Sequence, residues 1–405
     1  MEDLKSLAAE FKIKSPGTID QQRPVLLMEG QQDLRLIVAH HLQKLGYQKI
    51  IQVANGMEAL EQISANNGRI SVMIAAMDND IMGGIDLLNE IRENPQYERG
   101  PFAISMSSPG KEKIMLATES GVDEILVKPF TLKDIIPKLN MAFKVFHNPL
   151  NPEKVYELAK GAFREEKFDL AAKVYQRLAD ATTNSARPFV GLARVALKQG
   201  KADDALKLLE EAEKRNPNYV HLFAMRGEVL VNQNKVPDAI ANFRKAIDMS
   251  PLNPVRYERA AGILFDQKQY EDGIALLSLA LRNEIKFPGL HHFLSQGYYF
   301  IREFKKAVKH IRMALAADPQ NVTYLNQLGI SYKESEEYEE ATKVYNSIIK
   351  IDPTNKAALY NKAILLHTKG QVDDAVKILQ RLVDKNPDFA PAKTKLAEYQ
   401  KGKSA

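Results

Sequence analysis

Residues 322–355 read VTYLNQLGISYKESEEYEEATKVYNSIIKIDPTN, and the pattern of this stretch recurs at a constant period of 34 residues between Pro152 and Pro387. Each copy carries a marker, which is a small residue early in its second apolar stretch. The markers are Ala171, Ala205, Ala239, Gly273, Ala307, Ala341 and Ala375. A fixed period of this size indicates a repeat architecture in which each copy is one supersecondary unit.

Other positions keep phase with the marker. A mostly small residue stands 12 residues before it: Ala159, Ala193, Gly227, Ala261, Ser295, Gly329 and Ala363. A larger one stands four residues after it: Tyr175, Leu209, Phe243, Leu277, Ile311, Tyr345 and Leu379. Five units have a proline 12 residues after it: Pro217, Pro251, Pro319, Pro353 and Pro387. Each unit is therefore expected to form two amphipathic helices that approach closely at small residues, such as Tyr324–Lys333 and Tyr338–Ile351. In five units the proline is expected to end the second helix.

The run Gly329-Ile330-Ser331-Tyr332, with the pair Ala341 and Tyr345, resembles the tetratricopeptide repeat. The resemblance covers seven units over residues 152–387. It implies an all-α solenoid in which stacked helix pairs bury a continuous core. Residues 388–405 are expected to form a capping helix, Pro391–Gln400, and a tail.

Residues 23–146 have a different pattern, in which short apolar strands alternate with helices. The expected strands are Val25–Met28, Ile50–Val53, Ser71–Ala76, Phe102–Met106 and Glu124–Val127. The expected helices are Asp33–Leu45, Met57–Asn66, Gly84–Asn94, Lys111–Ser120 and Leu132–Phe146. Strands and helices in strict alternation predict a parallel sheet with helices on both faces, and ligands bind such sheets beyond the carboxyl ends of the strands.

Several short motifs in this region, in this order, resemble the response-regulator receiver domain. They are Arg35-Leu36, Leu45-Gly46-Tyr47, Ala54-Asn55-Gly56, Gly84 with Leu87-Leu88, Gly121-Val122-Asp123 and Val127-Lys128-Pro129-Phe130. The resemblance implies a flavodoxin-like, five-stranded parallel sheet of order 2-1-3-4-5, and its lysine-proline pair resembles the usual cis-proline turn of that family. The whole chain is therefore expected to be an α/β receiver-like domain followed by a tetratricopeptide solenoid.

The resemblance also implies a phosphorylation site. A working receiver has two acidic residues after the first strand, a nucleophilic aspartate ending the third, a hydroxyl on the fourth and a lysine after the fifth, with Mg²⁺ held by the carboxylates. Here Glu29 and Gly30 follow the first strand, Ala76 stands at the acceptor position and Met106 at the hydroxyl position. Only Lys128 matches. We therefore predict a degenerate receiver that is not phosphorylated, in which Lys128 pairs with Glu29.

One alternative stays open from the sequence. Asp78 lies two residues beyond Ala76, and a shorter loop would make it the phosphoryl acceptor. The chain would then be a phosphorylation-switched regulator that needs Mg²⁺ and a histidine kinase as partner. The plainer interpretation is that Asp78 and Asp80 belong to a solvated turn.

Charge divides unevenly along the chain. Residues 147–405 hold 40 Lys and Arg against 32 Asp and Glu, whereas residues 1–146 hold 16 against 19. The first helix of each repeat is expected to line the concave groove. The predicted groove residues are Lys160, Arg164, Arg187, Arg194 and Lys198 in the first two units, and His221, His292, Tyr299, Asn326, Tyr360 and His367 in the later ones. They predict either a site for an acidic partner segment or an ordinary solvated face.

Composition excludes other classes of protein. Without cysteine there is no disulfide framework and no thiolate metal site, as expected in the cytoplasm. No apolar run is long enough for a membrane span or signal peptide, and residues 1–22 predict a short helix, Glu2–Phe11, and a linker. We expect no enzymatic motif, no metal site (His291-His292 alone being too small a set) and no nucleic-acid partner, because the basic residues are scattered.

The sequence therefore predicts a non-enzymatic signalling adaptor. Its partner would be a protein or peptide in the repeat groove, with a histidine kinase or another signalling protein at the receiver. No cofactor is expected, apart from Mg²⁺ under the Asp78 alternative. A third interpretation is a rigid spacer, if the chain's own helix Pro391–Gln400 fills the groove.

Overall fold

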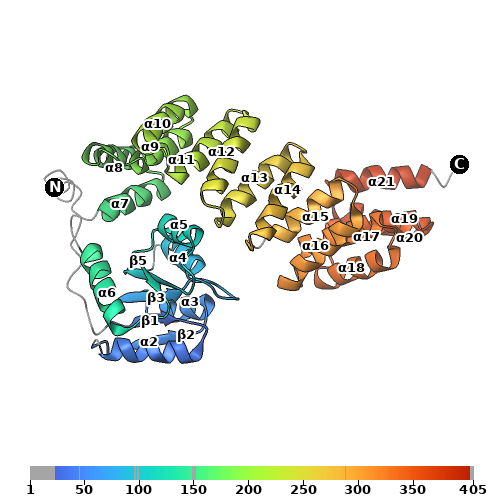
Figure 1. The fold of residues 1–405 in the computed structure, drawn as a ribbon. Coiled ribbons are helices and arrows are strands. Elements are labelled where there is room, and N and C mark those ends of the chain that lie inside the picture. The colour runs from blue at the N-terminus through green and yellow to red at the C-terminus, as the bar shows by residue number, and fades with distance from the viewer. Residues whose placement is uncertain are drawn as a thin grey trace. The chain divides into compact units, whose positions relative to one another are not determined.

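The computed structural model describes residues 23–44, 46–94, 97, 100–147, 152–287 and 289–401. The chain divides into two compact units between Leu252 and Asn253 (Figure 1). The expected helix Glu2–Phe11 lies outside the described residues. Within those residues, none of the helices combines the length and the apolar character that a bilayer crossing needs.

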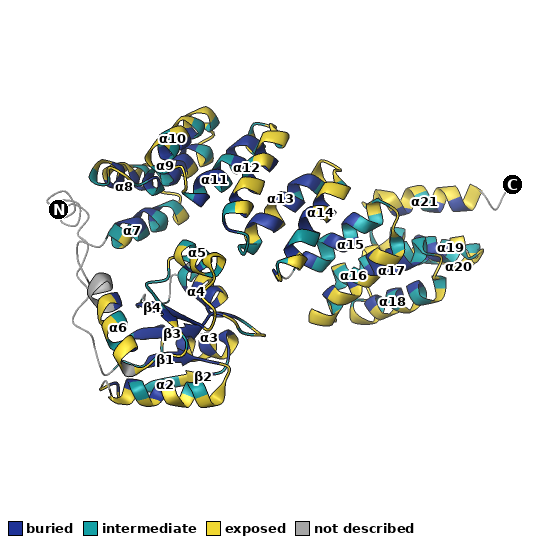
Figure 2. Cartoon of the chain, in the orientation of Figure 1, coloured by how far each residue is buried: buried dark blue, intermediate teal, exposed yellow. Residues whose placement is uncertain are grey.

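The first unit begins with a parallel five-stranded sheet of order β2-β1-β3-β4-β5, as the sequence predicts. The strands are β1 (Val25–Met28), β2 (Ile50–Val53), β3 (Val72–Ala76), β4 (Phe102–Met106) and β5 (Glu124–Val127). The three central strands β1, β3 and β4 are buried along their whole length (Figure 2). Continuous apolar runs are what a parallel sheet covered on both faces requires.

Side chains that alternate along β1 pack into two different cores. Val25 and Leu27 join the cluster under α2 (Gln32–Lys44) and α6 (Leu132–His147). Leu26 and Met28 join the cluster on the other face. The helices on that face are α3 (Gly56–Ala65), α4 (Gly84–Glu93) and α5 (Lys111–Ser120). The result is a three-layer α/β/α domain with the carboxyl ends of the strands at one edge.

Three helix pairs complete the first unit. They are α7 (Pro152–Arg164) with α8 (Phe168–Ala181), α9 (Arg187–Lys198) with α10 (Ala202–Arg215), and α11 (Val220–Asn232) with α12 (Val236–Met249). Four further pairs form the second unit. They are α13 (Pro254–Asp266) with α14 (Tyr270–Arg282), α15 (Leu290–Phe300) with α16 (Phe304–Ala317), α17 (Val322–Glu334) with α18 (Tyr338–Ile351), and α19 (Lys356–Thr368) with α20 (Val372–Lys385).

The repeat positions explain the packing within a pair. All six marker alanines are fully buried. In two units whose larger residue is an aromatic ring, the partner position is a glycine, because a side chain there would overlap the ring. A Cβ on Gly227 would lie 2.8 Å from Phe243, and one on Gly329 would lie 2.6 Å from Tyr345. Small and large residues are thus matched across each helix pair, as close packing demands.

The last helix, α21 (Ala390–Lys401), continues the stack of the second unit. Its Ala392 and Leu396 are buried in one cluster with Leu379 of α20. The ring of Tyr399 stacks on His367 of α19, with centroids 3.6 Å apart. His367, which the sequence predicts to line the groove, is therefore covered by α21.

Candidate functional site

The predicted phosphorylation-site positions gather at the carboxyl edge of the sheet. Glu29 directly follows β1, Ala76 ends β3, Met106 ends β4 and Lys128 directly follows β5. This arrangement arises because parallel strands present their carboxyl ends at one edge. The peptide bond between Lys128 and Pro129 is cis, as the resemblance implies. The structure thus places these positions together as the receiver resemblance expects.

Lys128 and Glu29 form an ion pair at this edge. The lysine Nζ lies 2.5 Å from Glu29 Oε2, and the two side chains are only 14% and 7% exposed. The other carboxylate oxygen accepts the backbone N–H of Gln31 at 3.2 Å. The geometry therefore contains the pairing that the sequence predicts, and both oxygens of Glu29 have a partner.

The other positions of this edge carry no oxygen ligand. The Ala76 side chain is a methyl group, 2% exposed, and the Met106 thioether is 1% exposed. At Gly30 a Cβ would lie 3.4 Å from the amide nitrogen of Asn79, and that amide donates to the carbonyl of Ala54 at 2.8 Å. Glu29 is thus the one carboxylate left where the resemblance implies three.

Asp78, the alternative acceptor, lies in the turn after β3. The strand ends at Ala76, whose register partner on β4 is Ser105. The Asp78 carboxylate is 68% exposed and pairs with Lys113 of α5 at 2.7 Å. Asp80 is also exposed. The structure therefore places Ala76, rather than Asp78, at the strand end beside Glu29 and Lys128.

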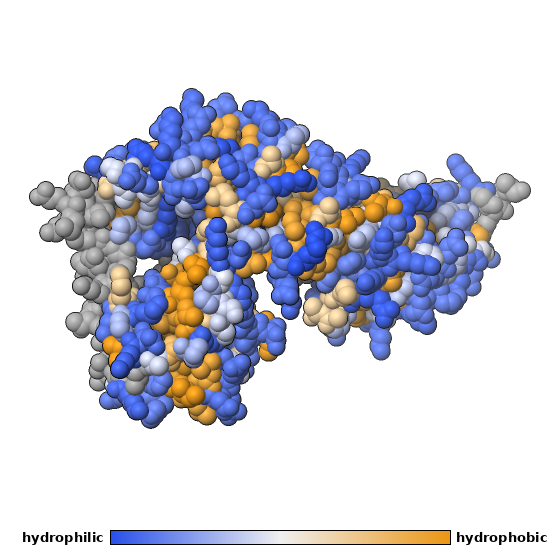
Figure 3. All heavy atoms as spheres, in the orientation of Figure 1, coloured by the Kyte–Doolittle hydropathy of each residue, from blue (hydrophilic) through white to orange (hydrophobic). Residues whose placement is uncertain are grey.

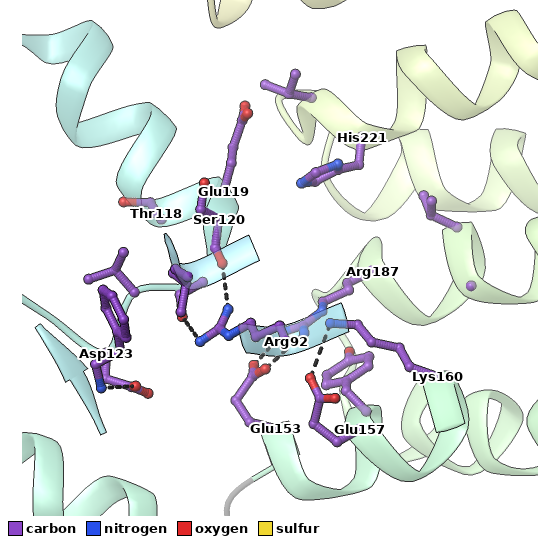
Figure 4. A pocket seen from close by; sticks show the side chains of 18 of the residues that line it. Arg92, Thr118, Glu119, Ser120, Asp123, Glu153, Glu157, Lys160, Arg187 and His221 are labelled. Atoms are coloured by element: carbon purple, nitrogen blue, oxygen red, sulfur yellow. Dashed lines mark hydrogen bonds and ion pairs between the residues drawn. The ribbon is translucent and has the colours of Figure 1, made fainter. Parts of the chain in front are cut away.

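A second candidate site is a cavity of about 990 Å³ within the first unit (Figure 4). One wall comes from the ends of α4 and α5 and from the loop Gly121–Asp123. The other wall comes from repeat helices α7, α8, α9 and from the start of α11. Of the predicted groove residues, this cavity brings together Lys160, Arg187, Arg194 and His221.

The cations of the cavity differ in how they are compensated. Arg187 forms a bidentate ion pair with Glu153 and lies 3.8 Å above the ring of Tyr156. Lys160 pairs with Glu157 at 3.2 Å, but burial lowers the pKa of its amine. Arg194 is exposed, and it has no hydrogen bond or ion pair to any residue that the structure describes. The wall of the repeats therefore keeps some positive charge available.

The receiver wall is fixed by Arg92. Its guanidinium donates to the carbonyl of Ser120 at 2.5 Å and to that of Gly121, where α5 ends (Figure 4). The backbone carbonyl of Arg92 in turn accepts from Arg164 of α7 at 3.1 Å. Asp123 accepts the N–H of Phe102 at 2.8 Å, and burial raises its pKa. Arg164, a predicted groove residue, thus links α7 to the end of α4.

The remaining predicted groove residues lie elsewhere. Lys198 is exposed and does not line the cavity. His292, Tyr299, Asn326 and Tyr360 belong to the second unit. The cavity therefore contains four of the eleven groove residues predicted from the sequence.

The sequence missed several residues that line the cavity. Glu153, Arg187 and His221 stand one repeat period apart, so the same helix position supplies an acid, a base and an imidazole. That in-phase series was a signal that could have revealed Glu153. Burial raises the pKa of Tyr219 to about 12, which marks it as another enclosed wall residue. The repeat pattern did not indicate Tyr219, because this residue lies directly before the first residue of α11.

Known protein families match two parts of the chain, the receiver region and the repeats. Residues 25–140 match the response regulator receiver domain. Segments 156–220, 190–254, 224–286 and 332–399 match the tetratricopeptide repeat.

Two relatives are chemotaxis proteins. The chain is 28% identical to chemotaxis protein CheY1 of Helicobacter pylori over 117 residues, which are 29% of this chain and 94% of that protein. It is 27% identical to the chemotaxis protein CheY homolog of Campylobacter jejuni over 115 residues, which are 28% of this chain and 88% of that protein. Both matches concern the receiver part of the chain.

A solved structure resembles the repeats. The C-terminal part of a TPR repeat-containing protein from Cytophaga hutchinsonii has a TM-score of 0.51 and 17% identity, over 59% of this chain and 98% of that one. At this identity the likeness concerns the fold alone. The matches and the geometry above show that the chain contains a response regulator receiver domain at residues 25–140, followed by tetratricopeptide repeats between residues 156 and 399.

Proposed function

We propose that this protein is a non-enzymatic signalling adaptor whose receiver domain is not phosphorylated and whose repeats bind a partner protein. The observation that carries the proposal is the chemistry of the carboxyl edge. A methyl group stands at the acceptor position, and Lys128 is paired with the one carboxylate that remains. The proposal places the protein in the cytoplasm, where a histidine kinase or another signalling protein would meet its receiver surface.

The residues at this edge do not fit Mg²⁺. A magnesium ion takes oxygen ligands in near-octahedral geometry, and receivers supply several of them as carboxylates. Here Glu29 alone offers a carboxylate, and its negative charge is neutralised by Lys128. Binding a dication would require the lysine to leave a buried partner, which is unfavourable. The edge is therefore better suited to hold the domain together than to bind a metal.

The alternative acceptor has less support. A phosphoryl acceptor in this fold works beside the metal-binding carboxylates and the lysine, whereas Asp78 is paired with Lys113 on the surface. Its exposed position is that of an ordinary turn aspartate. No contact of Asp78 with Glu29 or Lys128 among the described residues therefore supports the phosphorylation-switched function.

The cavity supports a partner with acidic character. Burial lowers the pKa of Lys160 although Glu157 pairs with it, so a second carboxylate beside it would further stabilise the charged amine. Arg194 offers a guanidinium with no partner among the described residues. Positive charge at a partly enclosed wall favours both encounter with and orientation of an acidic segment. The visible surface of the repeat helices is mostly hydrophilic, with apolar patches between the charged residues (Figure 3).

The receiver half of the proposal is tested with acetyl phosphate and Mg²⁺ on the full chain, followed by intact mass. We expect no phosphoryl adduct, under conditions in which a receiver that carries the acceptor aspartate is modified. An adduct that disappears in the Asp78→Asn variant would replace this proposal by the phosphorylation-switched regulator. An adduct that persists in that variant would contradict both assignments of the acceptor.

The repeat half is tested with a fluorescent hexaglutamate peptide and its hexaglutamine counterpart. We expect the full chain to bind the hexaglutamate peptide but not the hexaglutamine peptide. Arg194→Glu should raise the Kd for hexaglutamate about fivefold, which corresponds to about 1 kcal/mol. The matched control is Lys198→Glu, on the same helix but outside the cavity. Equal losses in the two variants would mean that net charge, rather than the cavity, attracts the peptide.

A further inference from the structure

Two histidines of the fifth helix pair face each other in the second unit. His291 lies on α15 and His310 on α16, and their Nδ1 atoms are 3.1 Å apart. Their rings are stacked with an interplanar angle of 29°. The two histidines are 19 residues apart in the chain and come together only where α15 packs on α16. We propose that His291 and His310 form a two-histidine site for a divalent transition-metal ion such as Cu²⁺, Ni²⁺ or Zn²⁺.

The separation of the two nitrogens suits one metal ion. Histidine nitrogens bind zinc at about 2.0–2.1 Å. With the nitrogens 3.1 Å apart, an ion at that distance from both would subtend an angle of about 95–102° at the metal. This lies between the square-planar preference of Cu²⁺ or Ni²⁺ and the tetrahedral preference of Zn²⁺. Binding of one ion by both Nδ1 atoms requires each ring to carry its proton on Nε2.

The protonation state agrees with this geometry. Imidazole binds metals in its neutral form. Burial lowers the pKa of His291, and burial together with His291 and Lys309 lowers the pKa of His310 to about 4. At neutral pH without metal, one ring therefore donates its N–H to the other.

The rings are held in place before any ion arrives. His310 stacks on Tyr298 with centroids 5.4 Å apart and an interplanar angle of 10°. The helices that carry the pair are anchored by Leu294 and Ile311, both fully buried. Both histidines are themselves half-buried, so an ion can reach them from solvent. Such preorganisation reduces the entropy lost on binding.

The surroundings define which ions fit. The donors are nitrogens, and the described residues contain no group of three His, Cys, Asp or Glu placed to share an ion. Hard ions such as Mg²⁺ and Ca²⁺, which require oxygen ligands, are therefore disfavoured. Lys309 and Lys306, which lies over the Tyr298 ring, add positive charge that weakens the site. The other coordination positions stay open to water or to a side chain of a partner.

The test is calorimetric titration of the full chain with CuCl₂ and, separately, ZnCl₂ in a non-coordinating buffer at neutral pH. We expect one site that binds Cu²⁺ more tightly than Zn²⁺, and its loss in both His291→Ala and His310→Phe. The phenylalanine keeps a ring against Tyr298, so that a folding defect is not mistaken for lost binding. The matched control is His292→Gln, because His292 packs on Tyr324 instead.

A second readout checks the ligands directly. Electron paramagnetic resonance of the Cu²⁺ protein should show coupling to two imidazole nitrogens, and the coupling should disappear in His310→Phe. Absence of binding by the original protein would overturn the proposal, and so would equal binding by the His310→Phe variant. Loss of binding in His292→Gln to the same extent would also overturn it, since the ion would then not depend on the facing pair.

Discussion

At the residue scale, Lys128 and Glu29 form a buried ion pair at the carboxyl edge of the sheet, where each compensates the charge of the other. A buried ion pair adds little to stability when it is compared with apolar residues of similar size. Removing one partner is strongly destabilising, because the remaining charge stays buried without a partner. The Lys128–Glu29 pair should therefore behave as a structural element of the receiver domain.

Replacing the lysine tests this role. We expect Lys128→Met to lower the free energy of unfolding of the receiver domain by about 3 kcal/mol, since it leaves the Glu29 carboxylate buried alone. The double variant with Glu29→Gln should recover most of that loss. Hydrogen-exchange mass spectrometry of peptides from β1 and β3 measures the loss of stability in Lys128→Met and its recovery in the double variant.

The control is the surface pair of the same domain. Lys113→Met removes the partner of Asp78, which is 68% exposed, so the loss should be below about 1 kcal/mol. Similar losses for the buried and the exposed lysine would contradict the structural role of the Lys128–Glu29 pair.

Tyr219 gives a pH-dependent prediction at the same scale. Burial raises its pKa to about 12, whereas an unfolded tyrosine titrates near 10. Between these values the unfolded chain releases the proton and the native one keeps it, so stability falls as the pH rises through this window. Below it the contribution is fully present. Tyr219→Phe should flatten the fall in urea-unfolding free energy above about pH 10, and an unchanged slope would show that the hydroxyl is not enclosed.

At the scale of elements, the repeats show how one packing rule accommodates an exception. The fourth unit has Gly273 where six units have a buried alanine. The space is not empty, because the ring of Phe265 fills it, and a Cβ on Gly273 would lie 2.1 Å from the ring. The same ring packs near Tyr270 and Phe293. Glycine at this marker is therefore required by the aromatic side chain of its own helix pair.

At Gly273, the alanine of the other units should lower the stability of the protein. Gly273→Ala restores the residue of the other units, yet we expect it to destabilise the second unit by about 2 kcal/mol through overpacking. Addition of Phe265→Leu should restore much of the stability. The control is Gly262→Ala on α13, where no atom lies within 4 Å of the new Cβ and the change should stabilise by up to about 1 kcal/mol. Thermal unfolding measures the stability of Gly273→Ala, of Gly273→Ala with Phe265→Leu, and of Gly262→Ala. An equal gain in stability from alanine at both glycines would contradict the role of the Phe265 ring.

Element bounds were predictable wherever periodicity set them. The helix Tyr338–Ile351 and the strand Phe102–Met106 agree with the structure residue for residue. The helix expected to begin at Tyr324 begins at Val322, because the side chain of Asn321 accepts the Tyr324 N–H at 3.1 Å and caps an earlier start. Apolar periodicity does not register a polar cap, so the sequence pattern began two residues late.

At the scale of the whole molecule, the sequence predicted the two kinds of domain and the carboxyl-edge pocket, because strand ends and repeat phase place those residues. It predicted only part of the cavity. Lys160, Arg187 and Arg194 follow from the repeat phase, whereas the wall built on Arg92 comes from tertiary packing within the first unit. The division between Leu252 and Asn253 also had no marker in the sequence, since the period of 34 runs through it unchanged.

That division makes a prediction about cooperativity. Lys128 belongs to the first unit and Gly273 to the second, so combining Lys128→Met with Gly273→Ala should give losses that add to within about 0.5 kcal/mol. Repeat arrays couple through nearest neighbours, and the two sites share no partner. Hydrogen exchange read separately on peptides from the two units provides the measurement. Each single variant should increase exchange only in its own unit, because opening free energies are local. An exchange increase that spreads across residues 252 and 253, or a double-variant loss more than about 1 kcal/mol from the sum, would show that the repeats unfold as one cooperative body.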